Sequence, residues 1–220
     1  MFLIVENIAR FSVLVPVIFY FFSKSKDKKS QVLFYFLIFI ILHQIIFNSL
    51  SIRESQYTEP FNAFYTPLEL LFTAFYIKSC LTTQVYKKII FSSLIIYFLS
   101  WSPLLITGQT QDYVSYIRAI TYSLILLYCL LYFYEQMRIP QTLFIYSQRQ
   151  FWGISGFLLF AAGTFFIFLF DQFSSNISEF MQQYVYIHAI LFIIRNLFFA
   201  ITFIIKSEKM PFADISPSIT

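Results

Sequence analysis

Seven stretches of apolar residues, each close to the length of one membrane-crossing helix, make up most of this 220-residue chain. A helix needs about 20 predominantly apolar residues to cross the hydrocarbon core of a bilayer. The stretches cover about residues 2–22, 31–50, 61–81, 89–107, 113–134, 151–173 and 181–205. We therefore expect an all-α polytopic membrane protein, a single bundle of seven transmembrane helices. The connections are too short for a soluble domain, and residues 206–220 form a short tail.

Lysine and arginine are distributed unevenly between the loops that join these stretches. If successive loops lie on alternate sides of the membrane, one side holds only Arg53. The other side holds Lys24, Lys26, Lys28, Lys29, Lys78, Lys87, Lys88, Arg138, Arg149, Lys206 and Lys209. Basic loops stay in the cytoplasm. We therefore expect the N-terminus outside and the C-terminus inside.

The composition agrees with a membrane protein. The chain is 59% hydrophobic and 12% charged, with a mean hydropathy of +0.71, which lies outside the range of soluble domains. A pI near 9.0 raises the possibility of a nucleic-acid partner. However, the basic residues follow predicted helix ends, and no groove-reading motif accompanies them. The lipid bilayer is the expected partner, and the lysines of residues 23–30 are expected to attract anionic lipid.

The first apolar stretch is expected to remain as an anchor. It begins without a lysine or arginine, and four lysines follow it. A secretory signal has the opposite order, with a positive start and a small-residue cleavage site.

Ionisable residues inside the predicted helices give the main functional signal, because a charge at membrane depth is costly and is usually paired or functional. The set is Glu6, Arg10, His43, Glu69, Arg118, His188 and Arg195. At 1.5 Å per residue, all of them except Arg195 fall in the outer half of the membrane. Because they come from helices far apart in the chain, we expect them to line a cavity open to the outer side of the membrane or to form a buried charge network.

Two ion pairs follow from these positions. Glu6 and Arg10 are four residues apart and can pair on one helix face. Glu69 and Arg118 share an outer depth, so we expect them to neutralise one another across the third and fifth helices. The five charged groups sum to +1, which leaves one arginine in need of an anion, a water or a carbonyl. A ligand or ion cavity and a purely structural network both remain open.

Small residues and prolines modify the predicted helices. Gly156 and Gly163 are seven residues apart and lie on one helix face, where small residues let two backbones approach closely in lipid. We expect this face to pack inside the bundle, with a dimer seam as the alternative. Pro16, Pro67 and Pro103 each remove one helical hydrogen bond and are expected to bend their helices.

Several chemistries lack the residues they need. The seventh stretch has a lysine, Lys206, only at its end, so a retinal Schiff base is not expected. There is no HExxH pair and no glycine-rich phosphate loop. Cys80 and Cys129 have no nearby His or Cys in the sequence and are interpreted as packing residues. We expect no metal, no cofactor and no enzymatic activity.

Two segments carry a resemblance to a known type of protein. They are YTPLELLFTAFY (65–76), with its buried acid, and FWGISGFLLFAAGTFF (151–166), which opens the sixth helix. With seven helices and an outside N-terminus, the chain resembles small seven-helix inner-membrane proteins of the Bacteroidota, which look like the sensing half of bacterial seven-helix receptors and accompany sensor histidine kinases. The resemblance covers most of the chain and identifies no ligand. It implies a signalling context and the inner (cytoplasmic) membrane of a bacterium, so that the expected cavity would be open to the periplasm.

The favoured interpretation is an accessory sensor or receptor-like subunit that binds an unknown small ligand. Its output would pass to a membrane partner, such as a sensor kinase or other complex subunits, near Arg138, Arg149, Lys206 and Lys209. A small-solute or ion transporter is one alternative, and a structural or assembly subunit of a larger membrane complex is the other.

Overall fold

The computed structural model describes residues 2–23, 27–53, 58–107, 110–138, 144–171 and 177–205. Within these ranges the chain is helical and contains no strand, so the predicted all-α fold is confirmed. The elements are α1 (Phe2–Ser12), α2 (Leu14–Phe22), α3 (Lys28–Arg53), α4 (Thr58–Cys80), α5 (Gln84–Thr107), α6 (Thr110–Arg138), the one-turn 3₁₀ helix η2 (Ile145–Ser147), α7 (Arg149–Asp171) and α8 (Ile177–Ile204).

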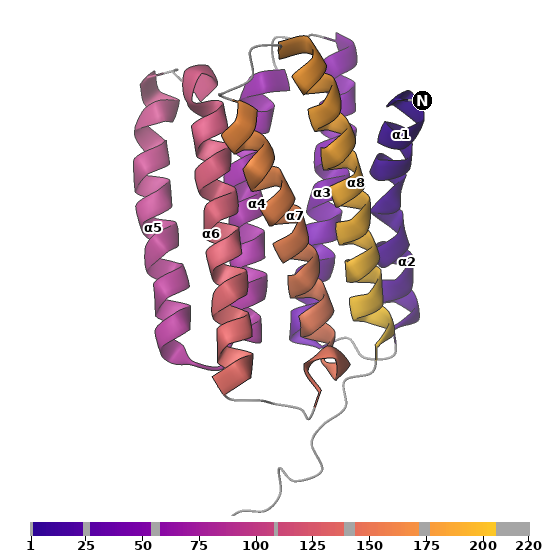
Figure 1. The fold of residues 1–220 in the computed structure, drawn as a ribbon, viewed down its shortest axis with the longest axis vertical. Coiled ribbons are helices and arrows are strands. Elements are labelled where there is room, and N and C mark those ends of the chain that lie inside the picture. The colour runs from indigo at the N-terminus through magenta and orange to yellow at the C-terminus, as the bar shows by residue number, and fades with distance from the viewer. Residues whose placement is uncertain are drawn as a thin grey trace, which may run out of the picture.

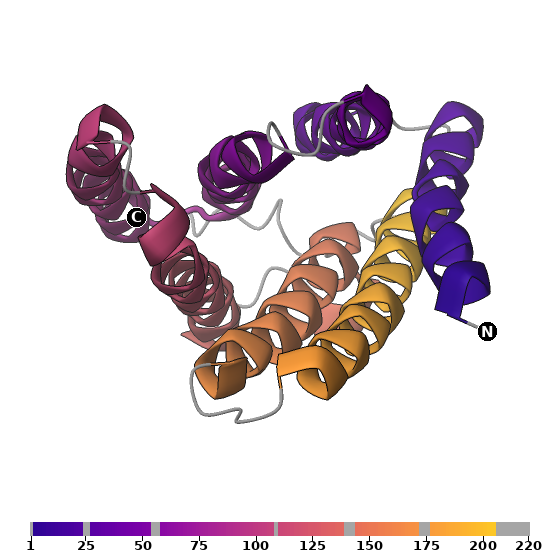
Figure 2. The ribbon, with the colours of Figure 1, turned by 90° about the horizontal axis from the view of Figure 1, so that it is seen from above.

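The helices run side by side along one axis, with the N-terminus at the upper end of the bundle in Figure 1. Seen from above, α5, α4 and α3 form one side and α6, α7 and α8 form the other (Figure 2). The helix pair α1 and α2 closes one end of the ring and packs against α8. At the other end α5 lies against α4 and α6.

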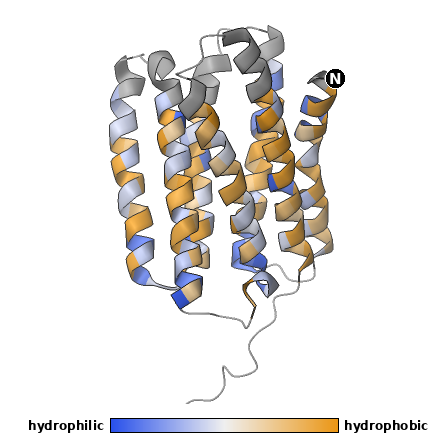
Figure 3. Cartoon of the chain, viewed as in Figure 1, coloured by the Kyte–Doolittle hydropathy of each residue, from blue (hydrophilic) through white to orange (hydrophobic). Residues whose placement is uncertain are grey.

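Five helices in the described part of the chain are long and apolar enough to cross a membrane. They lie at Ile4–Phe22, Lys28–Ser49, Tyr116–Arg138, Arg149–Phe168 and Val185–Ile204. Apolar residues recur along the helices of the bundle (Figure 3), and many of the large ones are exposed. Phe11 and Ile96, for example, are each 67% exposed. Water would disfavour such a surface and lipid would not. The chain is a multi-pass membrane protein.

A break at Val13 separates α1 from α2, and Pro16 explains it. Proline has no N–H group to donate to the carbonyl of Ser12, four residues earlier. The Ser12 hydroxyl instead donates to the carbonyl of Ala9, at 2.6 Å. The predicted interruption at Pro16 is therefore confirmed, whereas α4 and α5 continue through Pro67 and Pro103.

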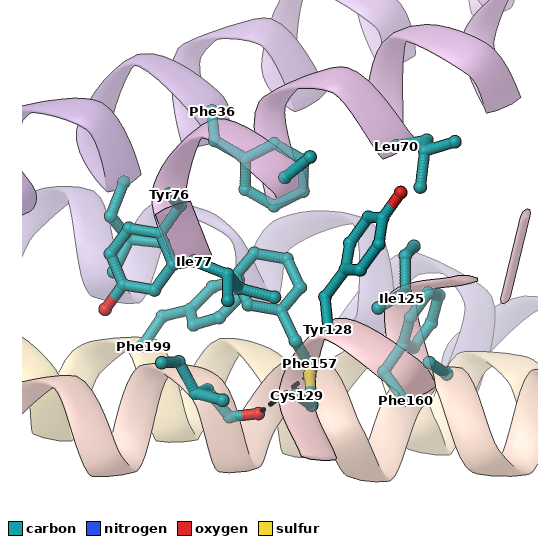
Figure 4. Close-up of a cluster of buried hydrophobic side chains, with 14 of the residues drawn as sticks. Phe36, Leu70, Tyr76, Ile77, Ile125, Tyr128, Cys129, Phe157, Phe160 and Phe199 are labelled. Carbon is teal, nitrogen blue, oxygen red and sulfur yellow. Dashed lines mark hydrogen bonds between the residues drawn. The ribbon is translucent and has the colours of Figure 1, made fainter. Parts of the chain in front are cut away.

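Packed aromatic side chains fill the middle of the bundle (Figure 4). Phe36, Tyr76, Phe157 and Phe199 are at most 1% exposed and come from four different helices. The Cys129 thiol lies against this cluster, 3.7 Å from the carbonyl of Ile154. Cys80 is also buried and free, so the interpretation of both cysteines as packing residues is confirmed.

Two glycines allow α7 to lie very close to α8. A Cβ at Gly156 would stand 2.9 Å from the Cβ of Phe198 and 3.3 Å from the backbone carbonyl of Arg195. A Cβ at Gly163 would stand 2.3 Å from the Leu191 side chain. Both contacts lie inside one molecule, which confirms the predicted packing within the bundle. Gly156 thereby holds the backbone of Arg195 close to α7.

Candidate functional site

A buried ion pair between α4 and α8 forms the polar centre of the bundle. Arg195 Nη1 donates to Glu69 Oε1 at 2.7 Å, and the two side chains are 0% and 2% exposed. The Tyr122 hydroxyl of α6 donates to the other carboxylate oxygen at 3.1 Å. The Tyr65 side chain, one turn before Glu69 on α4, contacts both charged groups. Both carboxylate oxygens therefore have donors, as a buried charge requires.

Four phenylalanine rings surround the guanidinium, and we call this set with Arg195 the arginine box. The distances from Arg195 Cζ to the ring centroids are 4.0 Å for Phe160, 4.6 Å for Phe192, 5.5 Å for Phe36 and 5.8 Å for Phe199. Aromatic faces attract a cation, most strongly where water is excluded. The rings thus compensate the part of the charge that Glu69 leaves unmatched.

The predicted partner of Glu69 was wrong. Its carboxylate binds Arg195, while the Arg118 guanidinium lies over the ring of Phe168, 5.3 Å from its centroid. Depth along the helices had suggested Arg118, but α4 and α8 present their buried residues to the same interior space. The predicted pair of Glu6 and Arg10 is confirmed, with 2.5 Å between nitrogen and oxygen.

A pocket of about 230 Å³ opens beside this centre, between α1, α3, α4 and α8. Four of the predicted site residues line it, namely Glu6, Arg10, His43 and His188. Its other lining residues are Ala9, Ile40, Gln44, Phe47, Asn48, Tyr65, Val185, Ala189 and Phe192. Of the remaining predicted residues, Glu69 and Arg195 lie behind the lining and Arg118 lies outside it. The pocket is smaller than the 300–1,000 Å³ typical of drug-sized ligands, which fits a small molecule.

Two side chains line the pocket and also contact the buried ion pair. Tyr65 lines the pocket, contacts Glu69 and Arg195, and has its ring 3.9 Å from that of His43. Phe192 lines the pocket and is also one of the rings of the arginine box. One layer of side chains therefore separates the pocket from the ion pair.

Arg10 connects α1 to α3 at the mouth of the pocket. It donates to the amide oxygen of Asn48 on α3 at 2.8 Å, in addition to Glu6 on its own helix. On the other side of α1, Asn196 of α8 donates to the Ser12 hydroxyl at 2.7 Å. These polar contacts hold α1 between α3 and α8.

A second buried polar cluster, at the lower end of the bundle, was missed by the sequence reasoning. Glu135 is 1% exposed and accepts hydrogen bonds from the backbone N–H groups of Thr82 and Thr83 and from the Thr82 hydroxyl. The end of the apolar stretch at residue 134 predicts a loop from residue 135 onward. The helix α6 in fact continues to Arg138, since Glu, Gln, Met and Arg are good helix formers.

The four residues predicted to contact a partner have different positions. Arg138 is exposed at the end of α6, with its guanidinium 5.7 Å from the ring of Tyr134. Arg149 is only 6% exposed and donates to the carbonyl of Ile205, so it holds the end of α8 and offers little surface to a partner. Lys206 and Lys209 lie outside the described residues.

The arginine box was also missed, although the sequence contained a signal for it. Phe192 and Phe199 are three residues before and four residues after Arg195, and such neighbours share a helix face. Phe36 and Phe160 come from other helices and no local pattern identifies them.

Metal binding finds no support in the described part of the chain, where no three His, Cys, Asp or Glu side chains lie close enough to hold an ion. No known protein family, curated protein or solved structure matches this sequence or fold. The pocket and the buried ion pair are therefore the features that bear on function.

Proposed function

We propose that the chain crosses the bacterial inner membrane seven times, with the N-terminus in the periplasm. The five membrane-length helices are joined in one ring by α4 and α5, which lie parallel to them and complete seven crossings. The orientation rests on the loops, where one side carries Arg53 and the other carries nearly all the remaining lysines and arginines.

Thiol labelling in intact inner membranes tests this topology. An impermeant reagent should modify cysteines introduced by Thr110→Cys and Ser175→Cys, and it should not reach Ser25→Cys or Ser218→Cys until the membrane is opened. The native Cys80 and Cys129 are 2% and 0% exposed, so their background should be low. Labelling of Ser25→Cys together with protection of Ser175→Cys would reverse the orientation.

We further propose that the protein is a receptor-like subunit that binds a small polar ligand in the pocket between α1, α3, α4 and α8. The observation that carries this proposal is the sharing of Tyr65 and Phe192 between the pocket and the buried ion pair. A ligand that moves either side chain changes the surroundings of Glu69 and Arg195. That pair joins α4 to α8, so occupancy of the pocket can bias how the two helices pack.

The interior below the pocket favours binding over passage. Phe36, Tyr76, Phe157 and Phe199 are packed across the bundle at the next level (Figure 4), each at most 1% exposed. A transporter needs a route past this layer. A receptor needs only the pocket and a change in helix packing.

The output of such a receptor passes to another protein. At the lower end of the bundle the turn between α4 and α5 is short, and Arg138 at the end of α6 is exposed. Exposed Arg138 and the tail, with Lys206 and Lys209, provide the partner contact in this proposal. A membrane-bound sensor kinase is the class of partner that the sequence resemblance implies.

Ligand capture tests the pocket. The protein should be purified gently from native membranes, and bound small molecules identified by mass spectrometry. Arg10→Gln should reduce the retained ligand at least tenfold, because it removes donors at the pocket mouth. Arg118→Gln is the matched control, since it removes the same charge from a residue outside the lining. Equal loss in both variants, or no ligand in the unaltered protein, would contradict the proposed pocket.

A structural subunit is the second candidate function. The ion pair and the arginine box also stabilise a bundle that binds no ligand, because they join several helices through buried contacts. Cross-linking from position 138 distinguishes the candidates. A specific kinase supports reception, whereas a large stable complex without retained ligand supports the structural role. If the purified protein moves a solute across liposome membranes, both candidate functions would be rejected in favour of transport.

A further inference from the structure

A groove of about 440 Å³ lies at the lower end of the bundle, opposite the ligand pocket. Three lysines from three helices meet there, Lys28 at the start of α3, Lys78 in the last turn of α4 and Lys87 in the first turn of α5. The rest of its lining is Val32, Tyr35, Phe72, Phe75 and Ser79. The groove thus combines a cationic end with an apolar wall.

The groove has the layout of a phospholipid. Tyr35 lies seven residues above Lys28 on α3, about 10 Å at 1.5 Å per residue, and Phe72 and Phe75 lie above Lys78 on the antiparallel α4. Tyr35 is 61% exposed and Phe75 is 48% exposed, so this wall faces out of the bundle. A phosphate beside the lysines would leave its acyl chains running along these aromatic rings.

The positive charges of the three groove lysines are available to an anion. The ion pairs in the described part of the chain are Glu6 with Arg10 and Glu69 with Arg195, so neither uses a groove lysine. The closest acid in sequence is Asp27, whose carboxylate accepts the backbone N–H of Ser30 at 3.0 Å. Lys78 lies 4.9 Å above the ring of Phe91, which positions its ammonium without neutralising it.

We propose that this groove binds the phosphate headgroup of an anionic phospholipid, with the acyl chains along Tyr35, Phe72 and Phe75. Basic pockets between helices at the cytoplasmic face of a membrane suit such headgroups. An aqueous anion would use only the lysines and leave the aromatic wall unexplained. The site is distinct from the ligand pocket, so either proposal can fail without the other.

Adjacent lysines provide a closely matched test. Lys28→Gln/Lys87→Gln removes two charges from the groove, and Lys29→Gln/Lys88→Gln removes two charges from the next residues on the same helices, outside the lining. Binding of short-chain phosphatidylglycerol to the full-length protein in detergent is measured by native mass spectrometry, with phosphatidylcholine as the neutral comparison. We expect at least a tenfold loss of phosphatidylglycerol affinity in the first variant and less than threefold in the second.

Four results would overturn the proposal. Equal losses of phosphatidylglycerol affinity in the two variants would mean that the lipid binds through diffuse surface charge and not at a defined site. Equal binding of phosphatidylcholine by the unaltered protein would exclude headgroup recognition, and full displacement by millimolar inorganic phosphate would make the site one for aqueous anions. If the groove variant fails to fold, the unaltered protein can be labelled with a photoactivatable phosphatidylglycerol instead. The proposal predicts labelled peptides from residues 28–35 and 72–79. Labelling elsewhere would exclude the groove.

Discussion

Glu69→Gln should destabilise the folded bundle by about 3–5 kcal/mol, the cost of leaving one partner of a buried ion pair uncompensated. Arg195 would keep its full charge at 0% exposure, with only an amide oxygen and the phenylalanine rings to offset it. Reversible unfolding in mixed micelles, driven by rising SDS and followed by circular dichroism, gives the free energy of unfolding.

The partner of Glu69 is identified by two double-mutant cycles. Glu69→Gln with Arg195→Gln should recover much of the single-mutant loss, because no buried charge is left alone. Glu69→Gln with Arg118→Gln is the control, and its effects should add within about 0.5 kcal/mol. Coupling to Arg118 and additivity with Arg195 would contradict the pairing in the structure.

The helices and their membrane character could be predicted because lipid imposes a simple rule. Each crossing needs a long apolar run, and each charge inside it stands out. The layer of Glu6, Arg10, His43 and His188 was found in this way, and the structure places these four side chains around one pocket. The i,i+4 pair of Glu6 and Arg10 followed from helix geometry alone.

The partner of Glu69 could not be found by the same reasoning. Depth along a helix follows from residue number, but the neighbours of a helix do not. In the ring, α4 and α8 present Glu69 and Arg195 to one interior space, and Gly156 brings α8 close to α7. An arginine side chain is long and points toward the N-terminus of its helix, so Arg195 reaches beyond the level of its own backbone. Such contacts depend on tertiary packing.

The ends of the helices were predicted less well than their centres. Apolar runs end where the chain meets polar surroundings, but the helices continue into good helix-forming residues, as α6 does to Arg138. This extra turn of α6 contains Glu135, whose carboxylate accepts hydrogen bonds from the backbone N–H groups just before α5. From sequence alone, an acid at this position is expected to be a solvated loop residue. Its buried role depends on how α6 packs against the turn at Thr82.

Glu135→Gln should be the second most damaging of these substitutions, at about 2–3 kcal/mol, because hydrogen bonds to a charged group are the strong ones. The carboxylate accepts the N–H of Thr82 at 2.6 Å and that of Thr83 at 3.3 Å, just before α5 begins at Gln84. A negative charge also suits the positive end of the α5 dipole. An amide would supply one acceptor oxygen and direct its own NH₂ donors at the remaining N–H groups.

The expected damage is local, because Glu135 joins α6 to the turn between α4 and α5. Limited proteolysis of the folded protein in micelles should cut the turn at 81–83 faster in Glu135→Gln than in the unaltered chain, and the same variant should unfold at lower SDS. Arg138→Gln is the control on the same helix end, where an exposed side chain should change stability by no more than about 0.5 kcal/mol. Thr82→Ala removes the hydroxyl and keeps the backbone donors, so its effect should lie between those of the other two variants. Equal stability of Glu135→Gln and Arg138→Gln would mean that the carboxylate does not hold the start of α5 to the bundle.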